Sequence, residues 1–386
     1  MNINRRMVLG GISTAAAAAV LPVEISRPAP DGTRVRKIAT EEAFVIPEMI
    51  GPLRDVLRRG GPNLDLKLLA LIYGEVSAAA LPSGAMPGAN RDAFARTLLP
   101  LLLDIDAGRL GDMDANGVDV HLLSLGIPGV QMFERDTAVA LATLTNDRLS
   151  EAVRRHPTRF CGLAAFAPQD PNAAAKEMER AINSLKLNGF LVNSHTDNAY
   201  LDAPRFWPIL EAAEALDAPL YIHPRAPSDG MAAPFGDYRL EGSAWGYGVE
   251  TGTHVMRLIF SGVLDRFPRL RIVIGHMGEA LPFWMWRLDF MGAPGSRAGR
   301  KNQLKPSEYF QRNFAITTSG VEDPLALRFA IDKLGVDHVM WAIDYPYQAT
   351  APAVAFLDAA SLSDQERAKI SYQNAERIFR IAPSRQ

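Results

Sequence analysis

The chain has 386 residues, 48% of them hydrophobic, and its 41 basic and 43 acidic side chains give a net charge of −2. A chain of this size can bury a large core, and its near-neutral charge offers no overall field for a nucleic acid, so we expect a small-molecule partner. The one cysteine, Cys161, excludes an intramolecular disulfide and any multi-cysteine metal cluster.

The N-terminal segment has the order of parts of an export signal. Arg5 and Arg6 precede an apolar run from Val8 to Leu21, which is shorter than a typical membrane span of ~20 residues and ends in small residues suited to cleavage. Twin arginines before such a run are typical of Tat export. We therefore expect residues 1–30 to be a Tat-type signal peptide or tail and residues 31–386 to form the folded domain. The expected location is the periplasm, with the cytoplasm as the alternative, and no membrane partner is expected.

Beyond this segment, short β-rich apolar runs alternate with segments of helical periodicity. Continuous apolar strands separated by helices predict a parallel sheet covered on both faces, and eight such units most economically close into a (β/α)8 TIM barrel. A doubly wound open sheet is the alternative, but it predicts a glycine-rich phosphate turn after the first strand, and none is there. The expected strands are residues 35–44, 118–125, 160–168, 188–195, 218–224, 270–278, 314–320 and 339–347.

Two insertions interrupt the alternation of strands and helices. Residues 59–93 follow the first strand and residues 225–248 follow the fifth, and both are rich in glycine, proline and aromatic residues. Loops that follow barrel strands lie at the catalytic end, so we interpret these insertions as a lid or a pocket wall. An oligomer contact is the alternative, and the two roles are compatible.

Polar side chains stand at the carboxyl ends of the expected strands, where the chemistry of such barrels takes place. Glu41, His223 and Asp344, from strands one, five and eight, offer two carboxylates and an imidazole, which are ligands suited to a divalent ion. Strands one and eight are neighbours in a closed barrel, so their two acids would repel each other unless a cation lay between them. Only one of the adjacent glutamates, Glu41 or Glu42, can face this site, because neighbouring strand residues point to opposite faces.

Two further histidines lie at strand ends. A lone histidine there is more often a hydrogen-bonded rim residue than a ligand. His276 is a stronger candidate, because glycines flank it in "IGHMGE" and Glu279 can orient its ring. His195, in "NSHT", is either part of the rim or part of the pocket wall.

A set of motifs follows in one order along the chain between Ile38 and Phe379: "TEEAF", "DMDANGVDV", "APQDP", "YIHP", "GVETGTHVMRL", "IGHMGEALP" and "DYPYQ". Together they resemble the metal-dependent decarboxylase branch of the amidohydrolase superfamily, the group of aminocarboxymuconate-semialdehyde and γ-resorcylate decarboxylases. Within that branch, "ATEEAF", "NSHT", "YLD", "GHMGEALP" and "DYPYQ" look most like the 5-carboxyvanillate decarboxylases.

The resemblance implies nonoxidative decarboxylation of a carboxylated phenol, either 5-carboxyvanillate or a dihydroxybenzoate- or salicylate-like acid. It assigns Glu41, His223 and Asp344 to one divalent ion, with Mn²⁺ favoured and Zn²⁺ next. It also makes Asp344 and His276 catalytic, with Glu279 bonded behind the histidine. We further expect a homo-oligomer, either a dimer or a tetramer.

Candidate substrate contacts also follow from the resemblance. They are Arg287, Tyr347, Phe44 and His195.

One position departs from the family pattern. Relatives that resemble the carboxyvanillate enzymes carry an arginine for the substrate carboxylate before the second strand, where this chain has Phe94, with Arg91 and Arg96 nearby. Either the segment shifts, so that Arg91 or Arg96 replaces that arginine, or the substrate is a different phenolic acid.

Two other functions compete with decarboxylation. Metal-dependent hydrolysis of a lactone or related ester is the first alternative. Ala43 stands where hydrolytic relatives carry the second histidine of an HxH pair, and this favours decarboxylation. A small-molecule binding protein on a barrel scaffold is the second alternative, and it predicts no bound metal.

Overall fold

The computed structural model describes residues 34–74 and 95–383. The expected export signal, the second part of the first insertion (residues 75–93), Arg91 and Phe94 lie outside these ranges, so what the sequence predicts for them stays a prediction. Fractionation of cells that express the full chain would check the export. Within the described ranges, no helix combines the length and the apolar character that crossing a membrane requires.

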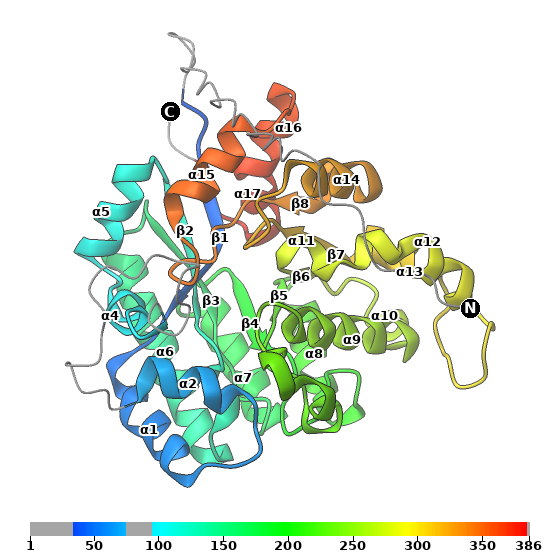
Figure 1. The fold of residues 1–386 in the computed structure, drawn as a ribbon, viewed down its shortest axis with the longest axis horizontal. Helices are drawn as coiled ribbons and strands as arrows, with labels where there is room; N and C mark the ends of the chain where they lie inside the picture. Colours follow the sequence, from blue (N-terminus) through cyan, green and yellow to red (C-terminus); the bar gives the residue numbers. More distant parts are fainter. Residues whose placement is uncertain (1–33, 75–94, 384–386) are drawn as a thin grey trace, which may run out of the picture. The chain divides into compact units, whose positions relative to one another are not determined.

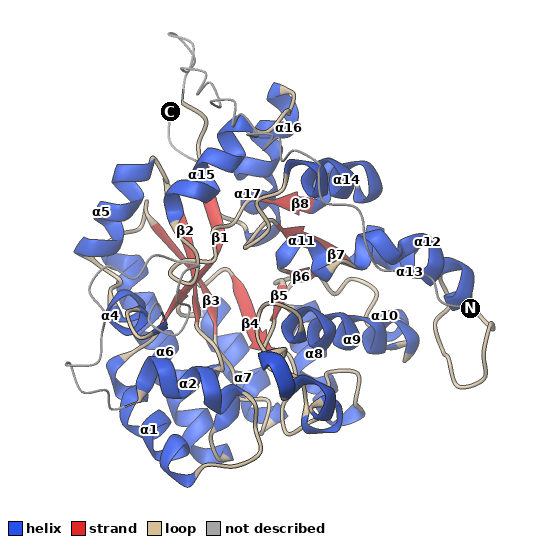
Figure 2. Ribbon diagram, in the orientation of Figure 1, coloured by secondary structure: helices blue, strands red, loops and turns tan. Residues whose placement is uncertain are grey.

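Eight parallel strands form one sheet in the order β1 to β8, with helices around it (Figures 1 and 2). Each strand pairs with the next along the chain. This sequential order confirms the (β/α)8 TIM barrel, because the order in a doubly wound sheet reverses at a switch point. The strands are β1 (Ile38–Phe44), β2 (Val120–Leu125), β3 (Phe160–Ala164), β4 (Gly189–Asn193), β5 (Leu220–His223), β6 (Ile272–Ile274), β7 (Phe314–Thr317) and β8 (Val339–Met340).

Helices connect successive strands. Asp170 and Asp323 cap two of them, because each aspartate stands before a proline and accepts backbone N–H groups of the first turn. The helices are α1 (Ile50–Arg59), α2 (Asp65–Tyr73), α4 (Leu98–Leu103), α5 (Ala107–Asn116), α6 (Arg135–Arg155), α7 (Pro171–Asn183), α8 (Trp207–Ala215), α9 (Gly246–Phe260), α10 (Val263–Arg266), α11 (His276–Glu279), α12 (Leu281–Gly292), α13 (Pro306–Asn313), α14 (Pro324–Leu334), α15 (Thr350–Ala359), α16 (Asp364–Ala368) and α17 (Asn374–Phe379).

The core has two parts. A large apolar cluster joins the strands to the surrounding helices. A second, smaller cluster takes residues from every strand, among them Ile38, Leu163 and Val273, together with Phe379 of α17. Side chains fill the interior of the barrel, so it is a packed core and not a pore. The functional residues are therefore expected at the ends of the strands.

Side-chain bonds join β1 to the last strand. Thr40 Oγ1 donates to the Trp341 carbonyl oxygen at 2.8 Å. The Glu42 carboxylate accepts the backbone N–H groups of Ile343 at 3.0 Å and Tyr345 at 2.9 Å. Burial raises the pKa of Glu42 to about 8, although both N–H donors favour the ionised form. Glu42 therefore joins β1 to the backbone on both sides of Asp344, and it is not among the described residues that line the pocket.

We predict that Glu42→Ala destabilises the fold by about 2–6 kcal/mol, because two buried N–H groups lose their acceptor and each such loss costs about 1–3 kcal/mol. Urea unfolding measures the effect. Glu42→Gln keeps one acceptor oxygen and should lose less. A Glu42→Ala protein as stable as the wild type would show that the fold does not need this carboxylate.

Candidate metal and catalytic site

Glu41 is a buried carboxylate held by hydroxyl groups at the carboxyl ends of the strands. Its Oε2 accepts a hydrogen bond from Thr317 Oγ1 at 2.9 Å and further ones from the hydroxyls of Tyr221 and Ser319. Its Oε1 is buried and accepts no hydrogen bond from a described residue. Burial raises the pKa of Glu41, but the nearby His276 and the hydroxyl donors outweigh it, so the pKa lies below its usual value and the group is ionised.

Glu41, His223 and Asp344 converge, with one potential ligand atom each and all three atoms within 4.8 Å of one another. His223 Nε2 is 3.3 Å from Glu41 Oε1. His223 Nδ1 lies 2.8 Å from the Pro224 carbonyl oxygen and 3.1 Å from Asn193 Oδ1, two acceptors, so Nδ1 carries the proton and Nε2 offers its lone pair. Burial lowers the pKa of His223 to about 4, which keeps it in the neutral form that binds metals.

These residues fit a divalent ion. Two carboxylates and a neutral imidazole are suitable ligands for Mn²⁺ or Zn²⁺. Oε1 of Glu41, which accepts no hydrogen bond from a described residue, can serve as one of these ligands. Gly275, at the end of β6, approaches Glu41 so closely that a Cβ there would lie 2.8 Å from both carboxylate oxygens. The backbone at Gly275 therefore packs directly against the Glu41 carboxylate.

His276 stands beside the same group. Its Nδ1 is 2.9 Å from Glu279 Oε1, and its Nε2 is 3.8 Å from Glu41 Oε1 and 3.9 Å from Asp344 Oδ2. Burial acts to lower the pKa of His276, but the carboxylates of Glu279 and Glu41 outweigh it and hold that pKa well above its usual value. His276 is therefore placed to hold a proton near Asp344.

The backbone is strained at two of these residues. His276 has φ 52° and Asp344 has φ 73°. Both values lie in the left-handed region, which residues other than glycine rarely adopt. Such strain persists only where the surrounding structure imposes it, and it concentrates at functional sites. The fold thus fixes the direction of both side chains.

A pocket of about 460 Å³ opens onto this group. His223, His276 and Asp344 line it, together with Tyr347. Burial raises the pKa of Tyr347 well above its usual value, so its hydroxyl stays protonated. Both insertions contribute to the wall, which confirms the pocket-wall interpretation for their described parts. The wall residues from the two insertions are Leu64, Asp65, Lys67, Leu68 and Leu71 from the first and Ala226, Arg239, Glu241, Gly242, Ser243, Ala244 and Tyr247 from the second.

The other predicted substrate contacts are not among the described residues that line this pocket. Phe44 is wholly buried in the core. His195 is buried, with Nε2 3.2 Å from the Ala226 carbonyl oxygen. Arg287 is exposed on α12, and Arg96 is half-buried in a turn. Contact of Phe44, His195 or Arg287 with a substrate therefore stays a prediction.

An amidohydrolase family model matches residues 101–381. A γ-resorcylate decarboxylase of a Polaromonas species is 39% identical over 293 residues, which cover 72% of this chain and 89% of that protein. The chain belongs to the amidohydrolase family, in its decarboxylase branch.

Solved structures of decarboxylases share the fold of this amidohydrolase. The 5-carboxyvanillate decarboxylase of Sphingomonas paucimobilis gives a TM-score of 0.84 at 49% identity, over 90% of this chain and all of that one. The enzyme of that name from Novosphingobium aromaticivorans gives 0.81 at 39% identity, over 90% of this chain and 96% of that one. The second structure contains manganese and 4-hydroxy-3-methoxy-5-nitrobenzoic acid.

Several residues that support the amidohydrolase site were not predicted from the sequence. Tyr221 and Thr317 hold Glu41, and Asn193 orients His223. Each is a polar residue in a short, mainly apolar strand, and this pattern is the one signal that could have revealed them.

A buried Ser–His–Glu group lies elsewhere on the scaffold. Ser194 Oγ is 2.9 Å from Glu250 Oε1 and 3.2 Å from His254 Nδ1. The backbone N–H of Leu201 donates to His254 Nε2 at 3.1 Å, so the ring proton is on Nδ1 and points to Ser194. His254 cannot take the serine proton in this arrangement, so the group supports the fold and does not activate a nucleophile.

Proposed function

We propose that this amidohydrolase is a carbon-carbon lyase that removes CO₂ from a carboxylated phenol without oxidation. Its substrate would be 5-carboxyvanillate or a dihydroxybenzoate- or salicylate-like acid. The observation that carries this proposal is the convergence of Glu41, His223 and Asp344 beside His276 in a largely apolar pocket. The decarboxylase relatives support it.

The pocket suits an aromatic acid. Leucines of the first insertion, together with Leu98 and Ile127, offer an apolar wall for the ring. We propose that the three-ligand group holds one divalent ion, with Mn²⁺ favoured and Zn²⁺ next. When bound, the ion supplies Lewis acidity toward the carboxylate and the ortho phenolic oxygen of the substrate.

Asp344 is proposed to deliver the proton. It protonates the ring carbon that bears the carboxyl group; the bond to the carboxyl carbon then breaks, CO₂ leaves, and the released electron pair restores the aromatic ring. His276 Nε2, 3.9 Å from Asp344 Oδ2, holds a proton that can recharge the acid. Glu279 keeps the ring of His276 in this orientation.

A product screen tests the reaction class. Enzyme loaded with Mn²⁺ is incubated with carboxylated phenols while CO₂ is measured, and with lactones while acid release is measured. We expect CO₂ from at least one phenolic acid and no acid from the lactones. Lactone hydrolysis without CO₂ release would contradict the proposal, and purified protein without any bound metal would favour a binding protein instead.

We also propose that the enzyme is a homo-oligomer, either a dimer or a tetramer, in which a second copy covers α12. Phe283, Trp286 and Phe290 on this helix are 70%, 69% and 69% exposed, and Phe283 meets Phe329 of α14 with ring centroids 6.1 Å apart. So many aromatic rings in water are typical of an interface. Arg287 stands on the same exposed helix, so its predicted substrate contact would require a second copy. Light scattering would check this, and the mass of a single chain would contradict it.

A further inference from the structure

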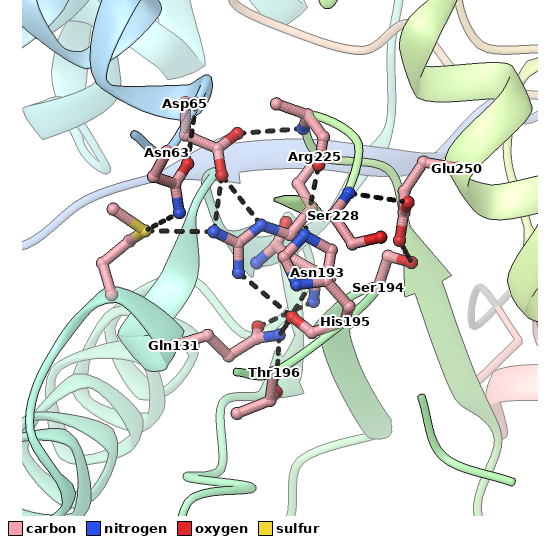
Figure 3. Close-up of polar contacts among 12 residues, drawn as sticks. Asn63, Asp65, Gln131, Asn193, Ser194, His195, Thr196, Arg225, Ser228 and Glu250 are labelled. Atoms are coloured by element: carbon pink, nitrogen blue, oxygen red, sulfur yellow. Dashed lines mark hydrogen bonds and ion pairs between the residues drawn. The ribbon is translucent and has the colours of Figure 1, made fainter. Parts of the chain in front are cut away.

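A buried ion pair joins the first insertion to the segment that follows His223 (Figure 3). Arg225 Nε and Nη2 lie 2.8 Å and 2.5 Å from Oδ2 of Asp65, the first residue of α2. The two side chains are only 2% and 4% exposed. Oδ1 of the same aspartate accepts the backbone N–H of Ala226 at 2.9 Å. Asp65 thus binds both the side chain and the backbone of this segment.

The position of the pair indicates what it does. A buried ion pair seldom stabilises a fold more than apolar side chains of the same size, because both charges lose their hydration. Asp65 lines the pocket, and the helix that it begins supplies much of the apolar wall. The ion pair therefore attaches α2, and with it this part of the pocket wall, to Arg225, which lies two residues beyond the candidate metal ligand His223.

Hydrogen bonds continue from the pair to Asn193 (Figure 3), whose side chain contacts the imidazole of His223. Arg225 Nη1 and Gln131 Nε2 both donate to the carbonyl oxygen of His195, each at 3.0 Å. The same Gln131 amide binds the backbone of Asn193 twice, by donating to its carbonyl oxygen at 2.7 Å and accepting its N–H at 2.9 Å. Asn193 Oδ1 in turn lies 3.1 Å from His223 Nδ1.

We propose that Asp65 and Arg225 are positioning residues of the metal site. They hold the ends of β4 and β5 together, and through Gln131 and Asn193 they keep Nε2 of His223 directed at Glu41. Without the ion pair, the ends of β4 and β5 lose a common set of contacts, and the imidazole of His223 is no longer held in one orientation. This inference rests on the proposed metal site, and it concerns the affinity of that site and not the identity of the substrate.

Mn²⁺ titration of the metal-free, full-length protein, followed by electron paramagnetic resonance, tests the proposal. We expect Asp65→Asn to bind Mn²⁺ about tenfold more weakly than the wild type, with an unchanged circular dichroism spectrum. Asp202→Asn is the matched control, because Asp202 also binds an arginine with both carboxylate oxygens: its Oδ1 lies 2.9 Å from Arg257 Nε and its Oδ2 lies 2.9 Å from Arg257 Nη2. These hydrogen bonds are exposed and lie outside the pocket. This control should bind Mn²⁺ as the wild type does.

Equal Mn²⁺ affinity of Asp65→Asn and the wild type would overturn the proposal. If Asp65→Asn does not fold, Arg225→Lys replaces it in the same titration with the same expectation, because lysine keeps the charge but cannot bind Asp65 and the His195 carbonyl together. A wild-type protein that binds no Mn²⁺ would overturn the metal site and this inference together. A protein that binds Mn²⁺ but releases no CO₂ would overturn only the proposed reaction.

Discussion

Asp344→Asn is expected to give a folded protein whose kcat is at least about 10³-fold lower than that of the wild type. Asparagine has no carboxyl proton to deliver to the ring carbon, and it also replaces one of the two carboxylates of the three-ligand group. CO₂ release at saturating substrate measures the loss, and circular dichroism shows whether the fold is kept.

The two roles of Asp344 can be separated by raising the Mn²⁺ concentration. Excess Mn²⁺ should restore occupancy if the substitution only weakens binding, whereas activity should not return, because the amide still cannot donate the proton. Substantial turnover of Asp344→Asn at full occupancy would rule out this residue as the acid. His276→Asn, which keeps Asp344, should then become the variant to test.

The sequence predicted all eight strands, because a parallel sheet covered on both faces needs continuous apolar runs and these are visible in one chain. It overestimated the length of every strand, and most of all that of the sixth and the eighth. The run at 270–278 gives only Ile272–Ile274, since residues from His276 onward adopt positive φ. The run at 339–347 gives only Val339–Met340, since the Glu42 carboxylate accepts the N–H groups beyond it. Backbone strain and side-chain bonding leave no trace in an apolar pattern.

The sequence also brought Glu41, His223 and Asp344 together, because polar residues at the ends of parallel strands meet at one rim. It did not reveal the contact between Asp65 and Arg225. These residues belong to different insertions, and no periodicity relates one irregular loop to another. The sequence also did not reveal that Arg287 is exposed on α12, because a motif carries no information on whether its residues face the pocket or the solvent.

Gly275→Ala is expected to lower kcat/KM by about 100-fold and Mn²⁺ affinity by at least about tenfold. The added Cβ would lie 2.8 Å from both carboxylate oxygens of Glu41 and 3.1 Å from Ser319 Oγ. The carboxylate therefore has to move away from the hydroxyl groups that hold it. The φ of Gly275 is −79°, which alanine adopts freely, so the effect is steric and does not come from the backbone.

Gly111→Ala in α5 separates this steric effect from a general effect of replacing glycine. Among the described residues, no atom outside the neighbouring backbone of α5 lies within 4 Å of a Cβ at Gly111, so this variant should keep wild-type activity and Mn²⁺ affinity and gain about 0.5–1 kcal/mol of stability. If Gly275→Ala binds Mn²⁺ as tightly as Gly111→Ala does, Glu41 is not a ligand. A weakening confined to Gly275→Ala would instead mean that metal binding depends on the position of the Glu41 carboxylate, whose Oε1 accepts no hydrogen bond from a described residue.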